Sequence, residues 1–166
     1  MFERLSSLFI KRKLPASNYH APRLIPNSFD IELTVRCNSK CLYCSYWKEH
    51  TKDLDIIYVK KFLKGISRWR TNETWITLLG GEPTIRPDLG EIVRYCIELG
   101  LKPSITTNGY RFSDYKYAKS IVSLGIERLV ISLDGFKETN NYTRTKVGFE
   151  RVIAAVDIKI SDIALS

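Results

Sequence analysis

The chain has 166 residues, about two-thirds of the roughly 250 in a closed (β/α)8 barrel, so a complete eight-fold barrel is excluded. Its 44% hydrophobic and 27% charged residues are typical of a soluble globular chain, and no apolar run approaches the ~18 residues that span a bilayer. The composition therefore argues against a disordered chain and against a transmembrane role. The formal charge of +8 suits a polyanionic partner and equally suits plain solubility.

The N-terminal segment lacks the charge order of a secretory signal. Residues 1–10 include an acid, and the basic run 11–13 follows the apolar residues instead of preceding them, so we predict a cytoplasmic protein. A short amphipathic helix docked on its own domain is expected here, with contact to a membrane as the alternative; its apolar residues are Phe2, Leu5, Leu8 and Phe9. We expect an N-terminal helix and connector over 1–28 and a core domain over 29–166.

Four segments have strand patterns, and helical patterns alternate with them. The first strand alternates apolar and polar residues with period two, and the others are short apolar or β-branched runs. The expected strands are residues 29–35, 75–79, 104–107 and 129–133. Apolar stripes at three- and four-residue spacing predict helices over 56–69, 89–97, 117–124 and 148–156. The stripe of the first helix comprises Ile56, Val59, Phe62, Leu63, Ile66 and Trp69.

Capping residues predict where these helices begin and end. Asp53 or Thr51 is expected to cap the first helix, and Ser113 the third. Pro87 suits the first turn of the second helix, and a glycine follows both the second and the third. Residues 156–160 alternate like a fifth strand, but no turn signal separates them from the preceding helix, so they are either a strand or the end of that helix.

Strands that alternate with amphipathic helices predict βα units around a parallel sheet. Right-handed crossovers then place the carboxyl ends of all strands, and the loops after them, at one edge. Every polar or glycine-rich cluster of this sequence follows a strand: the cysteines, residues 80–83, residues 108–109 and residues 134–135. We therefore expect the chemistry at that edge.

Three of the four cysteines, Cys37, Cys41 and Cys44, fall within eight residues, which is not a disulfide pattern and favours a reduced compartment. Structural zinc usually takes four ligands, and Cys96 falls on an apolar helical stripe, where it is expected to be a small buried residue. A cubane iron–sulfur cluster ordinarily takes four cysteines. Three thiolates would leave one iron open to an exogenous ligand.

These cysteines in a CxxxCxxC motif with an aromatic residue before the last one, followed by a GGEP sequence, resemble the radical S-adenosylmethionine (radical SAM) family. The resemblance covers about residues 30–156 and is greatest to the branch containing the molybdenum-cofactor cyclase and the SPASM-type enzymes that modify peptides. It implies an α/β fold, a truncated partial TIM-like (β/α) barrel with about four to five of the six parallel βα units of the radical SAM core. The motifs occur in the family order.

The resemblance also implies cofactors and an activity. Cys37, Cys41 and Cys44 would ligate three irons of a [4Fe-4S] cluster, and S-adenosylmethionine would chelate the fourth. Its reductive cleavage would give methionine and a 5′-deoxyadenosyl radical that abstracts hydrogen from a substrate. An external electron donor is therefore expected as a partner. No residue is assigned to catalysis itself.

Further residues are assigned to the cofactor by the same resemblance. Gly80, Gly81 and Glu82 would receive the methionine ammonium through main-chain carbonyls and a carboxylate, with Pro83 stiffening the turn, and Tyr43 would pack near the adenine. Strand ends would contribute groups for the methionine carboxylate or the ribose, namely Thr107 and Ser132, with Asn108 and Asp134 behind them. Each of these last four also has an ordinary structural explanation in a turn or strand exit.

The sequence departs from the family pattern in two ways. Only four of the six strands of the family core are evident, and no cysteine-rich C-terminal extension is seen in the given sequence. One hypothesis is an active radical enzyme that completes its barrel by pairing with itself or with a partner chain. A second is a degenerate or partner-dependent cluster-binding module without turnover of its own, and a third is a zinc-binding interaction domain. A peptide or a small metabolite is the expected substrate, with RNA as a weaker candidate.

Overall fold

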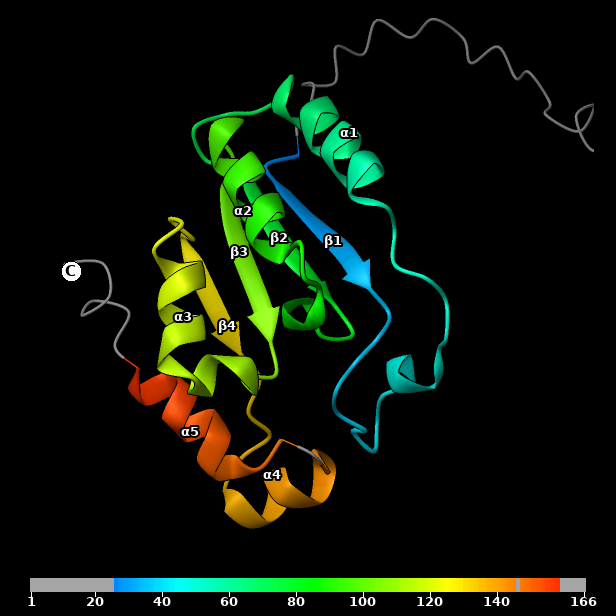
Figure 1. The fold of residues 1–166 in the computed structure, drawn as a ribbon, viewed down its shortest axis with the longest axis vertical. Helices are drawn as coiled ribbons and strands as arrows, with labels where there is room; N and C mark the ends of the chain where they lie inside the picture. The colour runs from blue at the N-terminus through cyan, green and yellow to red at the C-terminus, as the bar shows by residue number, and fades with distance from the viewer. Residues whose placement is uncertain (1–25, 146, 159–166) are drawn as a thin grey trace, which may run out of the picture.

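The computed structural model describes residues 26–145 and 147–158, and within them a four-stranded parallel sheet forms the centre of the molecule. Its strands lie in chain order, as Figure 1 shows. They are β1 (Ser28–Thr34), β2 (Trp75–Gly80), β3 (Lys102–Thr107) and β4 (Arg128–Ile131). The expected strands and their parallel arrangement are confirmed, although β4 ends two residues earlier than the sequence pattern suggests.

Five α-helices and three 3-10 turns connect these strands in the described part of the chain. The helices are α1 (Ile56–Ser67), α2 (Leu89–Glu98), α3 (Tyr115–Val122), α4 (Lys137–Thr143) and α5 (Phe149–Asp157). The turns are η1 (Tyr46–Lys48), η2 (Pro83–Ile85) and η3 (Arg111–Ser113). Helix α4 is absent from the sequence prediction because its KETNNYT sequence has no apolar stripe at helical spacing.

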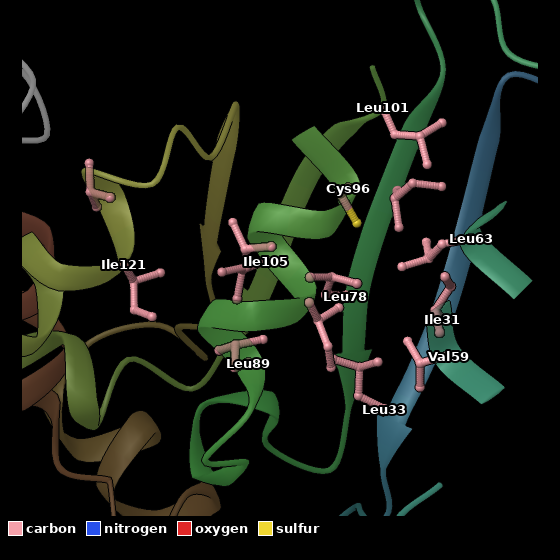
Figure 2. Packing of buried hydrophobic residues seen from close by; sticks show 14 of the residues in the cluster. Ile31, Leu33, Val59, Leu63, Leu78, Leu89, Cys96, Leu101, Ile105 and Ile121 are labelled. Carbon is pink, nitrogen blue, oxygen red and sulfur yellow. The ribbon is translucent and has the colours of Figure 1, made fainter. Parts of the chain in front are cut away.

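The hydrophobic core lies between the sheet and the helices that connect its strands. The register aligns Ile31 with Leu78 and Leu78 with Ile105, so these side chains share one face of the sheet. All three are buried, and they belong to one cluster with apolar residues of α1, α2 and α3 (Figure 2). The fully buried Cys96 is part of this cluster, as its position on the helical stripe predicts. Burial raises its pKa to about 12, which leaves a neutral thiol in the core.

The structure corrects both expected helix caps. Asp55, not Asp53 or Thr51, accepts a hydrogen bond from the backbone N–H of Ile57 at the start of α1. Asp114, not Ser113, caps α3 through the backbone N–H of Tyr117. In both places several polar residues precede the helix, and the local pattern alone does not select the one whose backbone is extended.

Two further expectations about helices are wrong in part. Phe62 and Trp69 of the predicted α1 stripe are 53% and 63% exposed, whereas Val59, Leu63 and Ile66 are buried. Pro87 precedes Asp88, the N-cap of α2, and so lies outside the first turn. The predicted apolar stripe includes too many residues, because α1 buries only the narrow side that faces the sheet.

The ends of the core are only partly described. Residues 156 and 157 belong to α5, so the start of the possible fifth strand is helical, and residues 159 and 160 lie outside the described residues. The expected N-terminal helix with Phe2, Leu5, Leu8 and Phe9 also lies outside them, and the boundary between residues 28 and 29 stays a prediction. None of the described helices is long and apolar enough to cross a membrane.

Candidate functional site

The loops at the carboxyl edge of the sheet surround a cavity of about 200 Å³. It is lined by residues from all four strand ends or the loops after them, together with one residue that follows α4. The lining residues are Cys37, Ser39, Cys41, Tyr43, Cys44, Tyr46, Leu79, Gly80, Gly81, Thr106, Thr107, Asn108, Ser132 and Arg144. The expected location at this edge therefore coincides with a real cavity.

The cysteine loop follows β1 and contributes three free thiols to the cavity. The backbone N–H of Ser39 donates to Cys37 Sγ at 3.4 Å, and the Ser39 hydroxyl lies 3.3 Å from Cys41 Sγ. Cys41 is buried, whereas Cys37 and Cys44 are half-buried. Burial raises the pKa of the Cys37 thiol, so a metal centre that binds the thiolate must displace a proton here.

Three cysteine thiols are the candidate metal donors of the cavity. Among the described residues, no group of three or more His, Cys, Asp or Glu side chains is arranged to hold one ion. A cubane cluster takes each thiolate on a different iron, so it requires sulfurs spread around a common space. Three free thiols lining one cavity satisfy that weaker requirement.

Gly80, the last residue of β2, and Gly81, which follows it, allow the end of β2 to pack against the cysteine loop. A Cβ on Gly80 would lie 2.2 Å from the Thr34 carbonyl oxygen, and one on Gly81 would lie 2.2 Å from that of Arg36. The backbone N–H of Gly81 donates to Thr34 O at 2.7 Å, and that of Glu82 donates to Arg36 O at 2.9 Å. The close approach that requires glycine is thus between two segments of this chain, at the base of the cysteine loop.

Glu82 is fully buried, and its carboxylate accepts four hydrogen bonds. Oε1 accepts from the backbone N–H and hydroxyl of Thr84 and from the hydroxyl of Thr107, at 3.1, 2.6 and 2.7 Å. Oε2 accepts from the backbone N–H of Asn108 at 2.7 Å. The side chain therefore joins the loop after β2 to the end of β3 and does not line the cavity.

Asn108 connects the end of β3 to the cysteine loop. Its side-chain amide donates to Asn38 Oδ1 at 2.7 Å and lies 4.0 Å from Cys37 Sγ. Its own Oδ1 accepts from the backbone N–H of Tyr110 at 3.0 Å, which fixes the amide orientation. Ser132 is tied to the same strand end, since its backbone N–H donates to Thr107 O at 2.9 Å.

Asp134, which lies after β4, also contacts the cysteine loop. Its carboxylate accepts from the hydroxyls of Tyr43 and Thr143 at 2.7 and 2.8 Å and pairs with Arg144 at 2.7 Å. Burial opposes ionisation, but these hydrogen bonds together lower the pKa of Asp134. The backbone N–H of Leu42 also donates to Thr143 O at 2.9 Å. Tyr43 thus acts as a bridge between the cysteine loop and the segment after β4.

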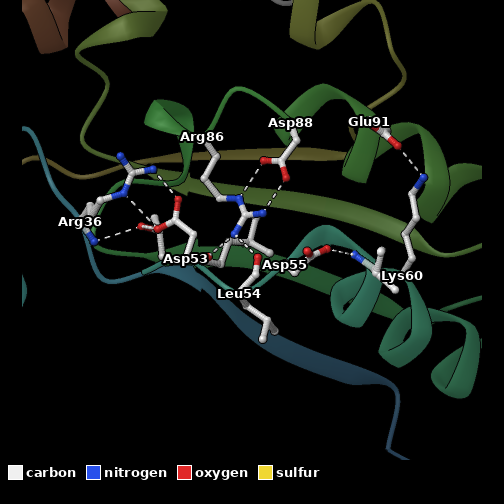
Figure 3. A network of polar contacts seen from close by, with 11 residues as sticks. Arg36, Asp53, Leu54, Asp55, Lys60, Arg86, Asp88 and Glu91 are labelled. Atoms are coloured by element: carbon white, nitrogen blue, oxygen red, sulfur yellow. Dashed lines mark hydrogen bonds and ion pairs between the residues drawn. The ribbon is translucent and has the colours of Figure 1, made fainter. Parts of the chain in front are cut away.

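A polar network supports the base of the cysteine loop (Figure 3). The buried Arg86 donates to both carboxylate oxygens of Asp88 at 2.8 and 2.6 Å and to the carbonyls of Leu33 and Leu54 at 2.6 and 3.0 Å. Figure 3 also shows Asp53 bound to the Arg36 guanidinium. The network therefore joins β1, the segment before α1 and the segment before α2.

The structure brings most of the predicted site residues together. Nine line the cavity: Cys37, Cys41, Cys44, Tyr43, Gly80, Gly81, Thr107, Asn108 and Ser132. Glu82, Pro83 and Asp134 do not line it. Arg144 lines the cavity but was missed, because it follows α4, which the sequence pattern did not reveal. Ser39 was also missed, although its position beside the cysteines was a usable signal.

The fold and the cysteine cavity define the class of this protein. The sequence matches the radical SAM superfamily over residues 31–159, and the chain belongs to that superfamily. It is 33% identical over 144 residues to the AdoMet-dependent heme synthase of Methanosarcina barkeri, covering 84% of this chain and 39% of that protein. It is 33% identical over 147 residues to a probable GTP 3′,8-cyclase of Saccharolobus islandicus, covering 82% of this chain and 46% of that one.

Solved structures agree with the fold. A structure of anSMEcpe with bound AdoMet is 25% identical with a TM-score of 0.66 and covers 83% of this chain and 41% of that one. Streptococcus suis SuiB bound to the precursor peptide SuiA is 23% identical with a TM-score of 0.69, covering 84% and 31%. These similarities confirm the partial barrel, and the chain spans less than half the length of these relatives.

Proposed function

We propose that this chain is a radical SAM enzyme core that binds a [4Fe-4S] cluster and S-adenosylmethionine at the cavity. The observation that carries the proposal is that three free cysteines and the glycine pair at the end of β2 line one cavity in a member of the superfamily. When bound, the two cofactors supply the hydrogen-abstracting radical chemistry. The protein's part is to hold and orient them.

The residues take distinct parts in this proposal. The thiolates of Cys37, Cys41 and Cys44 would each ligate one iron. Because the Glu82 carboxylate already accepts four hydrogen bonds, we assign its side chain to fixing the loop. The main-chain carbonyls of residues 80–82 would then receive the methionine ammonium, as glycine permits close approach there.

The remaining cavity residues would contact the rest of S-adenosylmethionine. Ser132, which follows β4, would hydrogen-bond the methionine carboxylate or the ribose, whereas the Thr107 hydroxyl at the end of β3 already donates to Glu82 and would only accept from a ribose hydroxyl. Tyr43 would pack near the adenine while its hydroxyl stays on Asp134. Asn108 and Asp134 would support these groups without contacting S-adenosylmethionine, since their hydrogen bonds hold the cysteine loop in place.

A cluster-binding module without turnover of its own is the second candidate. It is favoured by the size of the cavity, because about 200 Å³ is below the roughly 300–1,000 Å³ of typical small-molecule pockets. The described residues thus supply part of a cofactor pocket, and a further segment or partner chain would supply the rest. The relatives matched by sequence are named for heme synthesis and GTP cyclisation, which supports a small metabolite as substrate ahead of a peptide.

The test is anaerobic reconstitution with iron and sulfide, followed by dithionite reduction with S-adenosylmethionine and chromatography for 5′-deoxyadenosine. We expect about four irons per chain and product above the background of a triple Cys→Ala variant of Cys37, Cys41 and Cys44. A bound cluster without formation of 5′-deoxyadenosine would favour the cluster-binding module over the enzyme. Bound zinc without iron would contradict both the enzyme and the module.

Paired single variants make the cysteine assignment specific. Cys41→Ala should lose the brown colour and most of the iron, because it removes one cluster ligand. Cys96→Ala is the matched control, since Cys96 is buried in the core and lies on α2. It should keep full iron content while losing about 1 kcal/mol of stability through a small cavity. Equal iron content in both variants would refute the assignment of the triad.

A further inference from the structure

Helix α1 carries an apolar groove on the side that does not pack on the sheet. The groove has a volume of about 460 Å³, and all of its lining residues come from α1 or the turn directly after it. They recur at three- and four-residue spacing, so they form one continuous stripe. We call this stripe the α1 groove, and it comprises Tyr58, Lys61, Phe62, Gly65, Ile66 and Trp69.

The aromatic rings of the α1 groove are open to water. Tyr58, Phe62 and Trp69 are 61%, 53% and 63% exposed, whereas Val59 and Leu63 of the same helix are buried against the sheet. The helix therefore has a second apolar side beside the one that the core uses. Contiguous exposed apolar surface on a folded protein usually marks a contact with another segment or molecule.

Gly65 opens the middle of the α1 groove. Nothing among the described residues lies within 4 Å of the position that a Cβ would take there. Phe62 and Trp69 come from about one turn before it and one turn after it, so their rings border the opening. A side chain of another segment can therefore enter between the two rings.

The chain before β1 starts close to this groove and is long enough to reach it. At the beginning of the described residues, Asn27 O accepts a hydrogen bond from the backbone N–H of Trp75, the first residue of β2. Only residues 68–74 separate α1 from β2, so the start of β1 and the end of α1 lie at the same end of the sheet (Figure 1). Fully extended, residues 14–25 would span about 40 Å, twice the roughly 18 Å length of α1.

The first thirteen residues have a pattern that matches the groove. Phe2, Leu5 and Phe9 recur at the spacing of one side of a helix. A helix this short is marginal in water by itself, so its apolar side needs a surface that covers it. The charges are also complementary, because Glu3 is the only acid of this segment and Lys61 is the only charged residue that lines the groove.

We propose that residues 2–10 form a helix whose apolar side docks in the α1 groove of the same chain. The connector holds this segment at an effective concentration in the mM range, which favours it over a second copy of the chain. Docking covers the exposed rings and ties α1 to the segment that leads into β1, the strand before the cysteine loop. The contact requires neither a cluster nor S-adenosylmethionine, so it stands apart from the proposed function.

The experiment places a photo-crosslinker in the full chain as Phe9→p-benzoylphenylalanine and maps the products by mass spectrometry. Isotope-labelled and unlabelled chains are mixed, so that products within one chain and between two chains differ in mass. The matched control is Ser7→p-benzoylphenylalanine, because a helix places Ser7 on the side opposite the apolar residues. We expect the probe at Phe9 to reach residues 58–69 of its own chain with about fivefold or higher yield than the probe at Ser7.

Filling the groove should remove this crosslink. Gly65→Gln puts a larger side chain into the opening and improves helix propensity, so the fold is retained. The control Lys64→Gln changes the preceding residue, which is exposed and does not line the groove. With the probe at Phe9, we expect Gly65→Gln to lower the crosslink about fivefold or more and Lys64→Gln to leave it within about twofold.

Several results would overturn the proposal. Crosslinks that join two chains would place a second copy in the groove. Equal yields from the two probe positions, or no crosslink from either, would show that residues 2–10 are not held there. The sample is also irradiated with vesicles of phosphatidylcholine and phosphatidylserine. Loss of the crosslink within the chain, together with labelled lipid, would make an anionic membrane the partner instead.

A double-mutant cycle tests the same contact without a crosslinker. Phe9→Ser and Phe62→Ser should each lower the urea concentration at the midpoint of unfolding of the full chain. Because they remove one shared contact, the double variant should unfold at about the midpoint of the weaker single variant. Phe9→Ser combined with Tyr115→Ser on α3 is the control, and its shifts should add. Additive shifts for Phe9→Ser and Phe62→Ser would contradict the docking.

Discussion

Glu82 shows how one buried residue organises the site. A carboxylate with no solvent exposure is costly unless hydrogen bonds compensate the lost water, and here four donors from the loop after β2 and the end of β3 do so. Removing any of them would leave a buried charge with fewer partners. The GGEP segment therefore fixes the relative positions of two strand ends in addition to any contact with a ligand.

Gly81 is a residue at which a single added methyl group is expected to have a large effect. In Gly81→Ala the new Cβ would lie 2.2 Å from the backbone oxygen of Arg36, so the base of the cysteine loop must shift. We expect a loss of about 3 kcal/mol in the free energy of unfolding, together with reduced iron uptake. Urea denaturation and iron analysis after reconstitution measure the two effects.

Gly65 provides the matched control for that substitution. It lies inside α1, and nothing lies within 4 Å of the position of a new Cβ. Gly65→Ala should therefore raise the free energy of unfolding by about 0.5–1 kcal/mol through helix propensity, with unchanged iron uptake. If Gly81→Ala were also neutral, the close approach to Arg36 would not constrain the loop.

At the scale of elements, Arg86 joins segments that lie up to 53 residues from it in the sequence. Its guanidinium donates to the Leu33 carbonyl of β1, to the Leu54 carbonyl before α1, and to Asp88 before α2. The hydrogen bond from Arg86 lowers the pKa of Asp88 below its ordinary 3.8. The N-terminal end of α2 is thus coupled to the base of the cysteine loop.

Acid should weaken this coupling. Because the folded-state pKa of Asp88 lies below the unfolded value, its contribution is fully present above about pH 4 and is lost as the pH falls through the folded pKa. Asp88→Asn should cost about 1.5–3 kcal/mol at pH 7, and the difference from wild type should shrink on acidification below pH 4. Urea denaturation between about pH 3 and pH 7 measures this dependence.

The exposed pair of Lys102 and Glu73 gives a comparison for that result. Glu73→Gln removes an ion pair whose carboxylate side chain is 67% exposed, so the free energy of unfolding should stay nearly unchanged. A pH-independent difference between wild type and Asp88→Asn would show that the ionised carboxylate is not what holds Arg86.

At the scale of the whole molecule, the sheet has two edges without a neighbouring strand among residues 26–145 and 147–158. β1 pairs only with β2 on one side, and β4 pairs only with β3 on the other. Near the β4 edge, Leu129 and Ile131 line an apolar hollow together with residues of α5. An unpaired strand beside apolar surface favours pairing with further chain, from the same molecule or from another.

We therefore expect this chain, when isolated, to self-associate through β4. Val130 is 41% exposed on that strand, and Val130→Lys should shift the protein toward monomer by placing a charge at the edge. Sedimentation velocity over a concentration series measures the shift. Tyr115→Lys on α3, at a residue that is 52% exposed, should leave association unchanged. Association that is equal in both variants would place the interface elsewhere.

The sequence by itself determined the βα order, the parallel sheet and the edge of the sheet at which the candidate site lies. The alternation of apolar residues in strands and their three- and four-residue spacing in helices are local patterns that can be read from the sequence. The right-handedness of the crossovers then places the carboxyl ends of all strands on one side. The cysteine triad and the GGEP segment were equally local, so they identified the family that the comparisons confirm. Nine of the predicted site residues accordingly line one cavity.

Only the tertiary structure decided what each polar side chain contacts. Glu82 bonds Thr107 and Asn108 from 25 and 26 residues away, and Tyr43 bonds Asp134 from 91 residues away. Such contacts depend on how strand ends meet in space, which no local pattern specifies. For the same reason the sequence did not predict Arg144, which lines the cavity because it lies at the end of α4.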